Sequence, residues 1–333
     1  MTEFNHVNQS CSPLFVISLP RSGSTLLQRI LASHQEVATV AEPWLLLPLS
    51  QVIADYNVAA YSSYGCRAAR TAIDEMCSHL GRGREELLAI LRTAASELYA
   101  SLRSGDQRYF LDKTPRYYLI IDFLAELFPD AKFVFLLRNP LDVLASIIET
   151  WGHGRAWLHH YHQDIYAGPR LIADGLGRYG DRSICVHYEC LVNWPDFEMR
   201  RICDHLGIEF ASETLREFEA LDLSGSMGDP SRHKKVGRVT TERIDKWRYV
   251  LATTVRKRMA ARYIRSMGDS VLSQFGYNAD DLIDQIDQLP GSLSKAVEDC
   301  AALAASSVAR AVVANVVRSE WRNRSPDGIA KLS

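Results

Sequence analysis

The chain has 333 residues, enough for one large domain or for one domain with an appended segment. Hydrophobic residues make up 47% and charged residues 23%, proportions that are typical of a soluble globular protein. The formal net charge of −2 excludes a bulk electrostatic attraction to nucleic acid or acidic membranes, so any anion-binding site must be local.

The cysteines and the N-terminus bear on location. Seven cysteines are scattered without a CxxC spacing, which is typical of reduced thiols in a cytosolic protein. Residues 1–13 are polar and lack the basic and apolar regions of a secretory signal, and no stretch of 18 uncharged apolar residues spans a bilayer. We therefore expect a cytoplasmic protein with no transmembrane segment and no nucleic-acid partner.

The first expected strand, residues 14–19, is an apolar run typical of a strand buried on both faces. It leads into residues 20–25, Pro-Arg-Ser-Gly-Ser-Thr, and then into an expected helix. A strand, a loop of small residues and a helix suit phosphate binding, because amides at the helix N-terminus point at the anion. The alternative is a serine-rich turn that only begins a helix.

This loop differs from that of a nucleoside triphosphatase. When Gly23 is aligned with the second glycine of the GxxxxGK[ST] pattern, Ser24 stands where the pattern has its lysine. The strong cation of the loop is instead Arg21, whose guanidinium can bind two oxygens. The loop is therefore suited to an anion and poorly suited to a Mg²⁺-triphosphate.

The segments that follow predict alternating helices and strands. A mostly helical insert is expected at about 45–105, including a helix over 85–103 with one face formed by Leu87, Leu91, Ala95, Leu98 and Leu102. Buried strands are expected at 132–137 and 184–188, and helices at 117–127, 141–150 and about 197–206. This order predicts a parallel sheet with helices on both faces, with the 20–25 and 138–146 segments on the same rim.

The C-terminal third predicts further helices over about 241–275 and a long one over 294–321. The long helix is compatible with packing on its own domain, a homodimer contact, a lid or a membrane-surface helix. We thus expect a tail at 1–13, a domain at 14–280 and a C-terminal helical extension at 281–333.

Three motifs resemble those of sulfotransferases that use 3′-phosphoadenosine 5′-phosphosulfate (PAPS). Residues 19–27 resemble the family's 5′-phosphosulfate loop, and Arg138 to Ser146 its 3′-phosphate motif. Residues 186–192 are similar to its third-strand pattern, although Cys190 replaces an acidic residue. The resemblance covers about residues 14–275 and is closest to the carbohydrate, tyrosyl-protein and bacterial branch. It implies an α/β three-layer P-loop-like fold, in which helices flank a central parallel β-sheet.

The resemblance also implies how PAPS is bound. The 5′-phosphosulfate would lie on Arg21, Ser22, Gly23, Ser24 and Thr25, and the 3′-phosphate on Arg138 and Ser146. The alternative for Arg138 is an ion pair with Asp142. Three residues of a basic loop would close over the nucleotide: Lys235, Gly237 and Arg238. Tyr188 either reaches the nucleotide or belongs to the core.

Sulfuryl transfer needs cations near the transferred group and a base for the acceptor proton. By resemblance, the cations are Arg21 and Lys113, the latter within Asp-Lys-Thr-Pro at 112–115, and the base is Glu42. The alternatives are a surface lysine before a turn, and a glutamate that caps a helix or pairs with Arg21 or Arg29. The resulting prediction is metal-independent transfer from PAPS to an acceptor hydroxyl of a sugar, glycolipid or other metabolite.

Two further patterns resemble a dinucleotide site and a metal site, but we assign neither of these functions to them. Residues 175–180 match GxGxxG but precede a strand, so we expect a loop rather than a dinucleotide site. Four histidines lie beside aromatic residues without an acidic or cysteine pattern, so we expect a wall of the acceptor site rather than a metal site: His153, His159, His160 and His162. The rival functions are a small-molecule kinase on a degenerate P-loop and an inactive nucleotide-binding scaffold.

Overall fold

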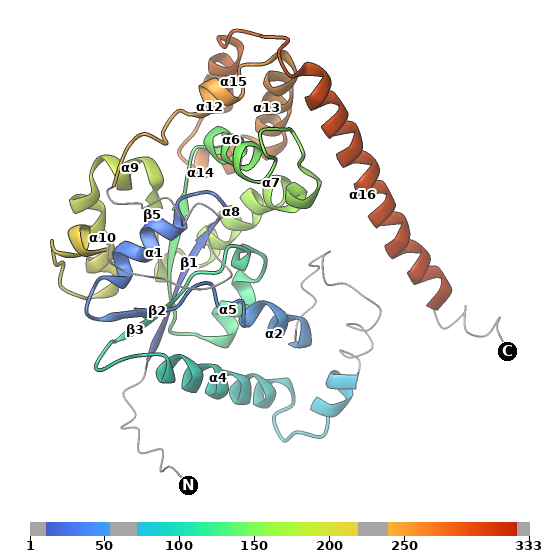
Figure 1. Cartoon of the computed structure of the whole chain (residues 1–333). Coiled ribbons are helices and arrows are strands. Elements are labelled where there is room, and N and C mark those ends of the chain that lie inside the picture. Colours follow the sequence, from blue (N-terminus) through green and yellow to red (C-terminus); the bar gives the residue numbers. More distant parts are fainter. Residues whose placement is uncertain (1–10, 54–71, 219–238, 325–333) are drawn as a thin grey trace.

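The computed structural model describes residues 11–53, 72–218 and 239–324 of the chain, with the side chains of 52–53 and 313–324 left aside. Its centre is a five-stranded parallel sheet in the order β2-β3-β1-β4-β5 (Figure 1). The strands are β1 (Ser12–Ser18), β2 (Val37–Thr39), β3 (Tyr109–Asp112), β4 (Lys132–Leu137) and β5 (Ser183–His187). The predicted parallel sheet between helical layers is confirmed, whereas the sequence does not predict β2 and β3, which are too short to show a period.

The alternation of side chains along the strands produces two hydrophobic cores, one on each face of the sheet. Phe15 and Phe133 belong to one core, and Leu14 and Val134 to the other. The second core is covered by α1 (Ser24–Ala32), α9 (Tyr188–Asn193) and α10 (Pro195–Leu206). The first core is covered by α4 (Arg84–Ser101), α5 (Ile121–Leu127), α6 (Pro140–Thr150), α8 (Gly168–Arg178) and α13 (Thr254–Met267).

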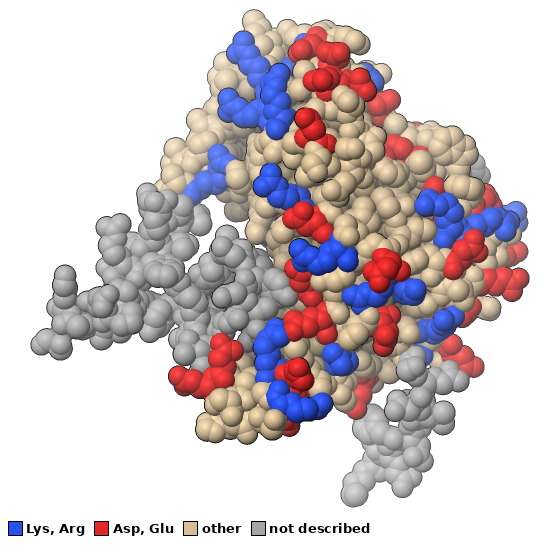
Figure 2. Space-filling model, turned by 180° about the vertical axis from the view of Figure 1, so that it is seen from behind, with Lys and Arg blue, Asp and Glu red and all other residues tan. Residues whose placement is uncertain are grey.

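The other helices connect these layers or extend the C-terminal part. They include α2 (Leu46–Ile53), α7 (His162–Tyr166), α11 (Thr214–Glu217), α12 (Trp247–Val250), α14 (Asp269–Gln274), α15 (Ala279–Asp287) and α16 (Ala296–Arg324). Basic and acidic side chains are interspersed over most of the face shown in Figure 2. Across the described residues, no helix is both long and apolar enough to cross a membrane.

The structure corrects two predictions of local structure. The GxGxxG match is not a loop, because Gly175 and Gly177 lie within α8. Gly175 is needed for packing there, since a Cβ at this position would lie 2.6 Å from Cδ1 of Ile121. The expected apolar face of α4 is only partly correct: Ala95 is buried as expected, but Leu98 and Leu102 are exposed, and Leu88 and Tyr99 are buried instead.

The long C-terminal helix α16 begins against the domain and then extends away from it (Figure 1). Asp299 is fully buried and forms an ion pair with Arg256 of α13, with Nε and Oδ2 2.7 Å apart. Ser306 accepts a hydrogen bond from the amide of Leu158 at 3.3 Å. Packing against its own domain is therefore confirmed for this part of the helix, while a homodimer through α16 and the domain boundaries stay predictions.

Candidate active site

The loop after β1 makes a sharp turn before α1. Arg21 and Gly23 both have left-handed backbone conformations, with φ of 70° and 93°. The turn buries the side chains of Ser22 and Ser24 and places Gly23 directly before α1. A Cβ at position 23 would lie only 2.4 Å from Cδ2 of Tyr188, so glycine allows the ring to lie against the loop.

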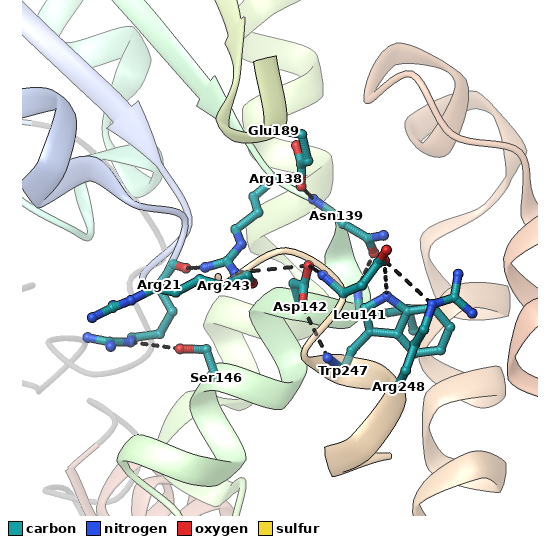
Figure 3. A network of polar contacts seen from close by, with 11 residues as sticks. Arg21, Arg138, Asn139, Leu141, Asp142, Ser146, Glu189, Arg243, Trp247 and Arg248 are labelled. Atoms are coloured by element: carbon teal, nitrogen blue, oxygen red, sulfur yellow. Dashed lines mark hydrogen bonds and ion pairs between the residues drawn. The ribbon is translucent and has the colours of Figure 1, made fainter. Parts of the chain in front are cut away.

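Arg138 joins the loop to distant parts of the chain (Figure 3). Its Nη1 donates to the carbonyl of Arg21 at 3.0 Å, and its Nη2 donates to the carbonyl of Arg243 at 2.6 Å. The guanidinium lies 4.4 Å from the ring centroid of Tyr188, and Asp142 is 4.0 Å away. The Nε is buried and has no hydrogen-bond partner in the described part of the chain, so at least this N–H of the guanidinium is left without a protein acceptor there.

Asp142 fixes the turn that carries Arg243, a feature that the sequence does not reveal. Its carboxylate accepts hydrogen bonds from the amides of Asp245 and Trp247, at 3.0 and 3.1 Å. Burial raises the pKa of Asp142, and the positive charge of Arg138 opposes this shift. Since the Trp247 ring is fully buried, the turn is held by packing as well as by hydrogen bonds (Figure 3).

Arg21 and Ser146 meet as the shared rim predicts. The Nε of Arg21 donates to the hydroxyl of Ser146 at 3.2 Å, although 125 positions separate them (Figure 3). The guanidinium also lies 5.6 Å from the ring centroid of Trp151. Trp151 in turn stacks on Tyr161 with centroids 4.4 Å apart, so an aromatic pair adjoins the loop.

Glu42 and Lys113 meet at the same loop. The Nζ of Lys113 lies 2.5 Å from Oε1 of Glu42 and 3.5 Å from the hydroxyl of Thr25. Oε2 of Glu42 accepts a hydrogen bond from the indole of Trp44 at 3.2 Å. The Lys113 side chain is only 2% exposed, so the alternative of a surface lysine is wrong. The structure therefore brings together a carboxylate, an ammonium and the start of α1.

Comparison with known proteins identifies the family of the chain. Residues 13–212 match the model of the sulfotransferase family. The chain belongs to the sulfotransferase family. The predicted family and enzyme class, a PAPS-dependent sulfotransferase, are thereby confirmed. This matched region contains the 19–25 loop, Glu42, Lys113 and the 138–146 segment.

Individual proteins are also similar to this chain. The nodulation protein NoeE of Sinorhizobium fredii is 30% identical over 304 residues, covering 81% of this chain and 68% of NoeE. A protein-tyrosine sulfotransferase of Drosophila melanogaster is 23% identical over 262 residues, and the chain spans 48% of it. The structure of a sulfotransferase domain from the curacin biosynthetic pathway matches with a TM-score of 0.53 and 20% identity, covering 81% of this chain and 99% of that domain.

The remaining predicted residues of this sulfotransferase fall into two groups. Lys235, Gly237 and Arg238 lie outside the described residues. The histidine-rich segment lies near the aromatic pair, with the rings of His160 and Tyr161 6.4 Å apart. Among the described residues, no group of three or more histidine, cysteine or acidic side chains is arranged to hold a metal ion.

Proposed function

We propose that this sulfotransferase moves the sulfuryl group of PAPS to an acceptor hydroxyl by metal-independent in-line displacement, with Glu42 as the general base. One observation carries the proposal: Glu42 and Lys113 lie 2.5 Å apart, and Lys113 lies 3.5 Å from Thr25 at the start of α1. This geometry supports a base and a cation at the loop that resembles the family's 5′-phosphosulfate loop.

The residues around the loop fit the two charged ends of PAPS. Backbone amides at the start of α1 and the hydroxyls of Ser22, Ser24 and Thr25 suit the 5′-phosphosulfate. The unpartnered Nε of Arg138 supports its assignment to the 3′-phosphate, together with Ser146. The ring of Tyr188 lies between Gly23 and Arg138, so it adjoins both parts of the proposed nucleotide site. Lys235, Gly237 and Arg238 would complete it.

The transfer step requires one proton acceptor and two cations. The acceptor oxygen forms a bond to sulfur while the bond from sulfur to the bridging oxygen breaks, and 3′-phosphoadenosine 5′-phosphate leaves with the electron pair. Glu42 takes the acceptor proton, and Arg21 and Lys113 stabilise the charge on the sulfuryl and leaving oxygens. Because Lys113 would then share its charge with the donor, its hold on the Glu42 carboxylate would weaken.

The rival functions have less support. A kinase needs a carboxylate at a strand end for Mg²⁺. Arg138 follows β4, and the carboxylate of Asp112 at the end of β3 already accepts hydrogen bonds from three hydroxyls. An inactive scaffold would be favoured if Glu42 and Lys113 were remote from the loop, and both lie beside it.

A hydroxyl acceptor is supported by the base and by the side chains around it. A carboxylate of this kind suits the abstraction of a hydroxyl proton. Trp44 contacts Glu42, and Trp151 adjoins Arg21, so flat apolar surfaces flank the proposed transfer site. Such surfaces suit a sugar ring or an aromatic acceptor, and the names of several relatives specify protein tyrosine.

Labelled PAPS and a panel of hydroxylated acceptors test the assignment. We expect Glu42→Gln to lower kcat by roughly 100-fold or more, the range for loss of a general base. The exposed Glu149→Gln is the matched control and should leave kcat unchanged. Full turnover by Glu42→Gln would remove Glu42 from the mechanism. Separately, thermal stabilisation by ATP with Mg²⁺ in preference to 3′-phosphoadenosine 5′-phosphate would refute the use of PAPS.

A further inference from the structure

A buried carboxylate lies next to Lys113 and is used by none of the steps above. Asp112 ends β3 and is completely buried. Its Oδ2 accepts hydrogen bonds from the hydroxyls of Tyr99 and Tyr117, at 2.7 and 2.9 Å. Its Oδ1 accepts one from the hydroxyl of Thr114 at 3.1 Å. Three hydroxyls therefore converge on one carboxylate.

Two of these hydroxyls also hold the segment that carries Glu42. Thr114 accepts a hydrogen bond from the amide of Trp44 at 3.4 Å, and Tyr117 accepts one from the amide of Leu46 at 3.2 Å. A hydroxyl has one proton, so a hydroxyl that donates to Asp112 turns its lone pairs toward other donors. The carboxylate thus orients both hydroxyls as acceptors for the backbone of residues 44–46.

The backbone of this segment needs such support. Trp44 has a φ of 54°, a left-handed conformation that costs a non-glycine residue free energy. Its indole nevertheless reaches back to Oε2 of Glu42, at 3.2 Å. Both the amide of Trp44 and its side chain are therefore held, one by Thr114 and the other by Glu42.

We propose that Asp112, acting through Thr114 and Tyr117, is a positioning residue that places Glu42 beside Lys113 for proton transfer. The inference rests on the proposed function, in which Glu42 is the base. Asp112 also precedes Lys113 in the chain, so one buried carboxylate sets the place of the base and of the cation together. None of its three hydrogen-bond partners belongs to the proposed nucleotide site.

Tyr99 offers a matched control. Its hydroxyl donates to the same carboxylate oxygen as that of Tyr117, and both rings are buried. Tyr99 stacks on Phe110, with centroids 4.4 Å apart, and within the described residues it makes no hydrogen bond to residues 42–46. Tyr117→Phe and Tyr99→Phe therefore remove the same group from Asp112, but only Tyr117→Phe releases Leu46.

The experiment measures kcat, the Kd for 3′-phosphoadenosine 5′-phosphate, and hydrogen exchange of the Leu46 amide in the full-length chain. We expect Tyr117→Phe to lower kcat about tenfold, the effect of one misplaced hydrogen bond, and to speed exchange at Leu46. The Kd should stay within about threefold of the unmodified protein. Tyr99→Phe should keep kcat within about threefold and leave exchange at Leu46 unchanged.

Equal losses of kcat in the two variants would overturn the proposal, as would a parallel loss of kcat and nucleotide affinity in Tyr117→Phe. If Tyr117→Phe does not fold, Thr114→Val tests the other link, and Thr114→Ser should restore kcat because it keeps the hydroxyl. Hydrogen exchange at Leu46 does not depend on turnover, so it tests only whether the Tyr117 hydroxyl holds the backbone amide of Leu46. Full turnover by Glu42→Gln would instead overturn the base assignment and leave the exchange result standing.

Discussion

A methyl group at position 23 would test the contact between the loop and Tyr188. In Gly23→Ala the new Cβ would lie 2.4 Å from Cδ2 and 2.6 Å from Cε2 of the ring. The ring has little room to retreat, because the guanidinium of Arg138 lies 4.4 Å from its centroid. Alanine would also have to adopt the φ of 93° that glycine has here.

These two effects set the expected magnitude. A left-handed backbone costs an L-residue about 1–2 kcal/mol, and overpacking by an added carbon costs about 1–3 kcal/mol. We therefore expect Gly23→Ala to lower the free energy of unfolding by about 2–5 kcal/mol. Affinity for 3′-phosphoadenosine 5′-phosphate should fall as well, since the strained residue lies in the proposed phosphate loop.

Urea unfolding of four variants separates the two contributions. Gly105→Ala is the control for backbone strain alone, because Gly105 has a φ of 72° and its Cβ would meet no atom within 4 Å. It should lose about 1–2 kcal/mol. In a Tyr188→Ala background, Gly23→Ala should lose no more than that control. If Gly23→Ala costs the same with and without the Tyr188 ring, the close approach is not the reason for glycine at this position.

Three further predictions concern nucleotide affinity, pH and the C-terminal helix. Arg138→Lys keeps the charge but loses the paired donors, so titration calorimetry should show a Kd for 3′-phosphoadenosine 5′-phosphate weaker by roughly 10- to 100-fold; an unchanged Kd would refute the assignment. Burial raises the pKa of Asp112 from 3.8 to about 6. At a pH between these two values, Asp112 is protonated in the folded chain and ionised in the unfolded chain. This residue's contribution to stability therefore falls by about 3 kcal/mol as the pH rises from below 4 to above 6, and Asp112→Asn should abolish that slope in urea unfolding. Asp299→Ala leaves Arg256 buried without its partner and should lower the free energy of unfolding by about 3–5 kcal/mol. Arg178→Ala, which breaks an exposed ion pair with Asp122, should lower it by less than about 1 kcal/mol. Equal losses would contradict the burial of the first pair.

The short polar motifs could be read from the sequence because each follows a strand. A strand buried on both faces shows as an apolar run, and a parallel sheet places the ends of such runs on one rim. This reasoning predicts that the 20–25 loop and the 138–146 segment lie together, and the hydrogen bond between Arg21 and Ser146 confirms it. The strands β2 and β3 escape the same reasoning because three or four residues carry too little pattern.

The faces of helices were less predictable. The spacing of leucines in α4 favours a face with Leu98, whereas the structure buries Tyr99 and exposes Leu98. The choice depends on Asp112, whose carboxylate attracts the Tyr99 hydroxyl into the core. In α16, Val297 and Val308 belong to a set of apolar residues at helical spacing, yet both are exposed, while Asp299 is buried against Arg256. In both helices a polar partner distant in sequence decided which face turned inward.

The phosphate loop thus shows what the sequence by itself determined. Its small residues, its arginine and its place after an apolar strand are local properties, so they predict an anion site without a structure. The partners of that site were decided only by the tertiary structure: Tyr188 against Gly23, Arg243 beside Arg138, and Lys113 beside Glu42. These contacts join residues between 71 and 165 positions apart in the sequence, and only packing of the sheet and its helices brings such residues together.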